Sequence, residues 1–60
     1  MDPNANLKEQ NDLLDSVDEF DQERIADLRE ALYDWLARGG FQPDWDKYTQ
    51  AGIAFNKWRS

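Results

Sequence analysis

DQERIADLREALYDWLARGGFQP, residues 21–43, carries every signal of a helix: a start, an apolar stripe and a stop. Apolar residues recur at helical spacing and predict one buried face: Ile25, Leu28, Leu32, Trp35 and Leu36. Asp21 is the expected N-cap. Gly39 is expected to end the helix in the left-handed conformation, and Pro43 prevents the helix from resuming. These signals predict a helix over residues 21–38.

A second helical pattern precedes this stretch. Asn6 followed by Glu9 resembles a capping box, which predicts a helix over residues 6–17. The apolar positions of this helix share one face: Leu7, Leu14 and Val17. Residues 1–5 are expected to form a flexible N-terminus. Because the link between the two helices, residues 18–21, is short, we expect an antiparallel helical hairpin.

The chain after Pro43 is harder to interpret. Asp44 is a possible cap for a third helix over residues 45–57, in which Gly52 costs about 1 kcal/mol relative to alanine. Residues 53–58 are also aromatic enough for a short strand, although no second strand is visible to pair with it. Residues 46–60 are therefore expected to form a helical or irregular segment that folds onto the hairpin.

The predicted fold class is all-α. Residues 6–45 form the hairpin and the GGFQP turn, and the aromatic and basic residues 46–60 pack on it. We expect six residues at the centre of the core: Leu28, Leu32, Trp35, Leu36, Phe41 and Trp45.

The charge is unevenly distributed along the chain. The net charge is −6, but residues 1–34 carry a net charge of −8 and residues 35–60 a net charge of +2. Such asymmetry suggests two faces with different partners, or head-to-tail association of copies. Residues 1–12 have neither a basic region nor an apolar run, so no secretory signal is expected. No apolar run approaches the roughly 20 residues that span a bilayer, and the cytoplasm is the default location.

The side-chain inventory argues against catalysis. The chain has no histidine and no cysteine, which removes most nucleophile–base pairs and most transition-metal sites. Four aspartates are spaced by three residues: Asp12, Asp15, Asp18 and Asp21. A calcium loop needs acids at alternate positions and an internal glycine, which this run lacks. We therefore expect a non-enzymatic protein without a cofactor or a metal.

Two sets of residues are candidates for binding a partner. The first is an acidic helix face, in which like charges stand four residues apart and cost a few tenths of a kcal/mol unless a basic surface docks there: Glu23, Asp27, Glu30 and Asp34. The alternative is a merely solvated surface. A sharper alternative is a DNA mimic that blocks a nucleic-acid-binding protein.

The second set interleaves aromatic and basic side chains near the C-terminus: Trp45, Tyr48, Trp58 and Arg59. Stacking combined with positive charge is how single-stranded nucleic acids are held. The structural alternative is that these aromatics complete the core. Because a molecule of net charge −6 repels phosphate at long range, nucleic acid is not the expected partner.

Two blocks of the chain match a pattern found in a group of phage proteins, and the matching residues are Asp2, Pro3, Asn4, Ala5, Leu7, Ala31, Leu32, Trp35, Leu36, Arg38, Gly39, Gly40, Phe41, Pro43 and Trp45. With these residues the chain resembles small proteins of unknown function from bacteriophages of actinobacteria. The chain departs from this pattern at Asn6, where threonine is usual, and in the extension after Trp45. The resemblance implies a phage-encoded accessory protein and supplies no assigned activity.

Together these features predict a non-enzymatic protein that binds a protein partner and modulates or inhibits a host factor. Self-assembly, with the surplus aromatics buried between copies, is the structural alternative.

Overall fold

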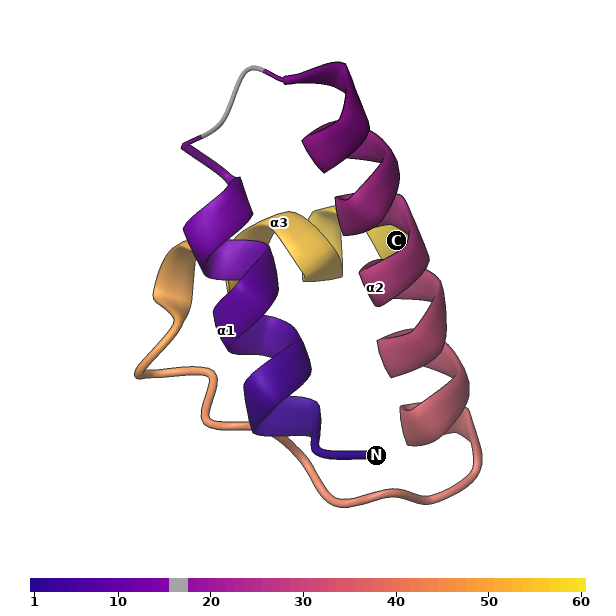
Figure 1. Cartoon of the computed structure of the whole chain (residues 1–60). Helices are drawn as coiled ribbons and strands as arrows, with labels where there is room; N and C mark the ends of the chain where they lie inside the picture. Colours follow the sequence, from indigo (N-terminus) through magenta and orange to yellow (C-terminus); the bar gives the residue numbers. More distant parts are fainter. Residues whose placement is uncertain (16–17) are drawn as a thin grey trace.

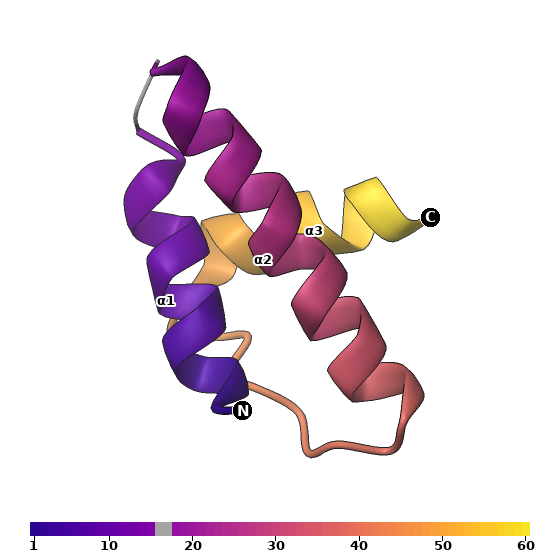
Figure 2. The same cartoon turned by 45° about the vertical axis from the view of Figure 1, so that its right-hand side comes forward.

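The computed structural model describes residues 1–15 and 18–60, and these contain three helices and no strand. They are α1 (Pro3–Leu13), α2 (Glu19–Ala37) and α3 (Thr49–Arg59). α1 and α2 lie side by side, and α3 crosses behind them (Figures 1 and 2). The segment from 38 to 48 passes the N-terminal end of α1 on its way to α3 (Figure 1). The all-α class is confirmed, and the alternative of a strand over residues 53–58 is wrong because these residues are helical.

α1 begins earlier than expected. The Asp2 carboxylate accepts hydrogen bonds from the backbone N–H groups of Asn4 at 3.0 Å and Ala5 at 3.3 Å. Pro3 occupies the first helical position, where a missing N–H costs nothing. Residues 3–5, expected to precede the helix, therefore form its first turn, and the predicted capping box at Asn6 is wrong. The helix ends at Leu13, and Val17 lies outside the described residues.

α2 also starts before its predicted cap. The Asp18 carboxylate accepts a hydrogen bond from the N–H of Phe20 at 2.8 Å, so Asp18 and not Asp21 is the N-cap. The predicted left-handed conformation at the end of the helix is confirmed, because Gly39 has a φ of 88°. The N–H of Gly39 donates to the Leu36 carbonyl and that of Gly40 to the Trp35 carbonyl. This pair of bonds is a Schellman motif.

α3 starts four residues later than predicted. Residues 45–48 form a turn in which the Asp44 carboxylate accepts a hydrogen bond from the N–H of Lys47 at 3.1 Å. In this turn the Trp45 ring stacks on the Phe55 ring, with centroids 5.8 Å apart. A Cβ on Gly52 would lie only 3.1 Å from the Trp45 indole, so the glycine allows this close contact.

The core lies where the three helices meet. Its fully buried members are Leu7 from α1, Leu32 from α2, and Ala51 and Phe55 from α3. Trp35, Leu36 and Trp45 were predicted at the centre of the core, but they are only partly buried and pack against this cluster from its edge. The prediction for Phe41 is wrong, because Phe41 remains 60% exposed and only lies edge-on against Trp35.

Candidate protein-binding surface

Four carboxylates form a stripe along the outer face of α2. We call Glu23, Asp27, Glu30 and Asp34 the acidic stripe. At 3.6 residues per turn these positions lie opposite the buried positions of the same helix: Ile25, Leu28 and Leu32. All four members of the stripe are exposed. The residues predicted to share a face are therefore brought together on solvent-accessible surface.

The acidic stripe is only partly neutralised. Asp34 forms an exposed ion pair with Arg38 at 3.1 Å, and Asp27 lies in the field of Arg24. Glu23 and Glu30 have no ion-pair partner among residues 1–15 and 18–60. The like charges along the helix therefore retain part of their mutual repulsion, which a basic partner would relieve.

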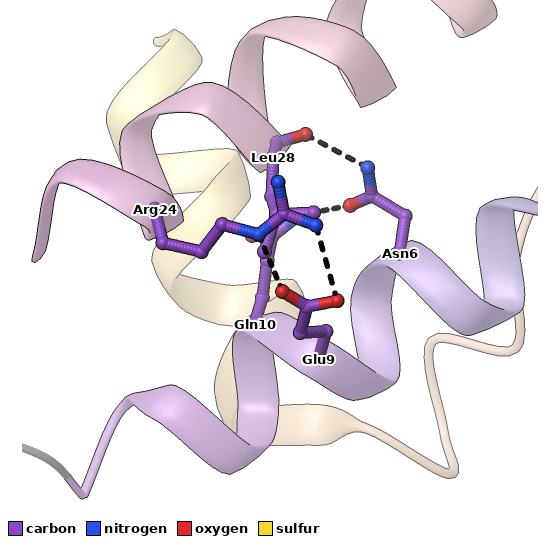
Figure 3. Close-up of polar contacts among 5 residues, drawn as sticks. All are labelled: Asn6, Glu9, Gln10, Arg24 and Leu28. Carbon is purple, nitrogen blue, oxygen red and sulfur yellow. Dashed lines mark hydrogen bonds and ion pairs between the residues drawn. The ribbon is translucent and has the colours of Figure 1, made fainter. Parts of the chain in front are cut away.

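A polar network fixes the opposite side of α2 to α1 (Figure 3). The buried Asn6 amide donates to the Leu28 carbonyl at 3.0 Å and accepts a hydrogen bond from Gln10 at 2.6 Å. At the edge, the Arg24 guanidinium pairs with the Glu9 carboxylate at 2.6 Å and 3.3 Å. The hydrogen bond from Arg24 lowers the pKa of Glu9, and the same bond raises the pKa of Arg24.

The C-terminal candidates gather around one buried ring. Trp45 and Trp58 each have a ring centroid 5.8 Å from that of Phe55, and the Arg59 guanidinium lies 5.1 Å from it. Tyr48 packs against the core and carries Lys47 over its ring at 5.6 Å. Trp45 and Tyr48 therefore contribute to packing, whereas Arg59 is exposed and Trp58 remains 41% exposed.

Several connections carry no signal in the sequence because they join distant residues. The Asn4 side chain accepts a hydrogen bond from the N–H of Asp44, and that of Asn11 accepts one from the N–H of Ala51. Each bond spans forty residues of chain. A shallow hollow of about 340 Å³ beside the acidic stripe was also not predicted, and it is lined by Met1, Ala31, Asp34, Trp35 and Arg38.

The described part of the chain contains neither a metal-ligating cluster nor a membrane-spanning helix. It holds no group of three acidic, histidine or cysteine side chains placed to hold a metal ion. None of its helices combines the length and the apolar character needed to cross a membrane. No protein-family model, characterised protein or solved structure matches the chain.

Proposed function

We propose that this protein is a non-enzymatic binding module whose acidic stripe docks on a basic surface of a protein partner. One observation carries the proposal: four exposed carboxylates line the face of α2 that points away from the core, and two of them lack a basic partner in the described structure. In this proposal α1 and α2 act as one antiparallel hairpin that presents the stripe as a rigid edge.

The charge density of the stripe favours a protein surface over a DNA-binding site. Residues 23 and 34 are eleven positions apart, which corresponds to roughly 16 Å along a helix. Four carboxylates over that length give about one charge per 5 Å, whereas each DNA strand carries one charge per about 3.4 Å. A DNA mimic is expected to approach the higher charge density. Because the acidic stripe does not, the DNA mimic is kept only as the alternative function.

The proposed setting is the cytoplasm of an infected bacterium, where the module would modulate or inhibit a host factor. The resemblance of the two sequence blocks to small actinobacteriophage proteins supports this setting. The RGGF part of the second block has a structural explanation, because Gly39 and Gly40 end α2 and make room for Trp35. We therefore assign binding to the acidic stripe and not to this motif.

The test is capture of partners from nuclease-treated host lysate with the tagged full chain, read by mass spectrometry. We expect Glu23→Lys combined with Asp27→Lys to abolish capture of whichever protein the native chain retains. Far-UV circular dichroism should show unchanged helicity, because both side chains are exposed.

The matched control is Asp12→Lys combined with Asp46→Lys. It changes the net charge equally and alters two exposed carboxylates outside α2. Capture that survives in the control and is lost in the stripe variant supports the proposal. Equal capture by both variants would contradict it. A melting temperature that rises with protein concentration would instead favour self-assembly.

A further inference from the structure

One face of α2 carries an arginine and a tyrosine, and the tyrosine contacts a tryptophan of α3. Arg29 and Tyr33 are one turn apart on α2, so they share a face. The Tyr33 ring packs edge to face against the ring of Trp58, which lies on α3, with centroids 6.2 Å apart. We call Arg29, Tyr33 and Trp58 the donor cluster. Figures 1 and 2 show α3 passing behind the middle of α2 at this level.

The donors of this cluster are not used within the described part of the molecule. The Arg29 Nε atom is buried and has no hydrogen-bond partner, and Arg29 forms no ion pair with residues 1–15 or 18–60. The Tyr33 hydroxyl and the Trp58 indole N–H form no hydrogen bond within the same residues. By contrast, the indole of Trp35 donates to the Phe41 carbonyl, and that of Trp45 donates to Gln42.

Unpaired donors of this kind call for an acceptor. The buried Nε–H of Arg29 loses hydration and gains no hydrogen bond in return, which destabilises the free protein. Tyr33 and Trp58 are 52% and 41% exposed, so an incoming group can reach both. The last turn of α3 adds the positive charges of Lys57 and Arg59. A carboxylate is the acceptor that matches a guanidinium in geometry and charge.

We propose that the donor cluster binds a carboxylate side chain of an acidic segment of another protein. The two aromatic rings cover the apolar part of that segment, and Arg29 pairs with its carboxylate. This site is distinct from the acidic stripe and takes a partner of the opposite charge.

The neighbouring charges favour a peptide over a nucleic acid. Glu30 and Asp34 of the acidic stripe border the cluster on α2 and repel a continuous polyanion. Lys57 and Arg59, which flank Trp58 in the last turn of α3, add positive charge that attracts a single carboxylate. The cluster therefore fits an isolated acidic side chain better than a row of phosphates.

The test uses the ¹⁵N-labelled full chain and a short blocked alanine peptide that carries a single glutamate. We expect the peptide to shift the indole N–H signal of Trp58. The signals of Trp35 and Trp45 should stay in place, because their donors are already bonded. Arg29→Gln should weaken peptide binding roughly ten-fold.

Arg38→Gln is the matched control, because it removes the same charge from an exposed arginine that is paired with Asp34. Tyr33→Phe removes one exposed hydroxyl and provides a second test if Arg29→Gln does not fold. Unchanged affinity in Arg29→Gln and Tyr33→Phe would overturn the proposal. It would also be overturned by equal binding of a lysine–alanine peptide, by preferred binding of single-stranded DNA, or by a Trp58 shift that depends on protein concentration alone. Glu23→Lys combined with Asp27→Lys, which leaves Glu30 and Asp34 in place, should leave peptide binding intact, so the two proposals can fail separately.

Discussion

Gly39 and Gly40 are adjacent in the chain, but different constraints act on them. Gly39 has a φ of 88°, in the left-handed region that costs other residues about 1–2 kcal/mol, and a Cβ there would meet nothing within 4 Å. Gly40 lies against the Trp35 indole, and a Cβ there would overlap the ring. The first glycine is needed for its backbone conformation and the second for the space it leaves.

This difference predicts that the same substitution lowers the free energy of unfolding by different amounts at the two positions. Gly40→Asn should lower the free energy of unfolding by about 1–3 kcal/mol, because the side chain displaces Trp35. Gly39→Asn should cost less than about 1 kcal/mol, because asparagine tolerates the left-handed conformation. Urea denaturation of the two variants measures both values, and equal losses would contradict the assignment.

At the scale of the elements, α1 holds the other parts of the molecule in place through its amide side chains. Asn4 contacts the segment before α3, Asn6 contacts α2, and Asn11 contacts the first turn of α3. The last contact matters because the residue at the N-cap of α3 is Tyr48, which makes no capping hydrogen bond. Asn11 therefore caps α3 from another helix, at the third backbone N–H of its first turn.

Asn11→Ala should fray the start of α3 and lower stability by about 1 kcal/mol. Amide hydrogen exchange at the first turn of α3 is the direct measurement, and exchange there should accelerate more than in α2. Asn56→Ala is the control, because Asn56 is an exposed asparagine on α3 itself. Equal exchange in the two variants would show that the Asn11 bond does not cap the helix.

The ion pair between α1 and α2 predicts a dependence on pH. The pKa of Glu9 is lowered below its ordinary value of 4.5, so the folded state holds the charged form more strongly than the unfolded state does. The stabilisation is complete above pH 4.5 and is lost as the pH falls through the lowered pKa. Glu9→Gln should therefore be less stable than the native chain near neutral pH, and the difference should shrink in acid.

Thermal denaturation across the acid range measures this difference. Glu30→Gln is the control, because Glu30 has no ion-pair partner in the described structure. Since the pair is exposed, the effect should be small and should weaken with added salt. A difference in stability between Glu9→Gln and the native chain that grows as the pH falls would contradict this prediction.

At the scale of the whole molecule, a small core joins three helices. Phe55 is fully buried, stacks on Trp45, contacts Trp58 with tilted rings, and belongs to the cluster that includes Leu7 and Leu32. A chain of this length has a free energy of unfolding of roughly 3–9 kcal/mol. The loss of one large core residue is therefore comparable with the entire stability.

Phe55→Ala should cost about 3–5 kcal/mol and leave much of the protein unfolded at physiological temperature. Near-ultraviolet circular dichroism of the tryptophans should lose its fine structure. Ile53→Ala is the control in the same helix, because Ile53 is 64% exposed and should change stability by less than about 0.5 kcal/mol. If Phe55→Ala unfolds cooperatively with the same melting temperature as the native chain, the central role of this ring is contradicted.

The sequence by itself determined the features that depend on neighbours within a few residues. Helical spacing placed Ile25, Leu28 and Leu32 on the buried face of α2 and the acidic stripe on the opposite face. Gly39 ends the helix because glycine easily adopts the left-handed backbone conformation that breaks the helical pattern. Such features follow from the period of the helix and from local hydrogen bonds, which the order of residues specifies directly.

The tertiary structure alone decided which faces meet and which polar groups pair. Asn6 lies inside α1 because the helix already begins at Pro3, and its amide instead pairs with the Leu28 carbonyl on another helix. Trp45 lies in a turn before α3 and not in the predicted helix, and its ring stacks on Phe55. Phe41 lies outside the core. The cap of α3 by Asn11 and the donor cluster join residues far apart in the chain. Periodicity shows which residues share a face, but packing in three dimensions selects the partner of that face.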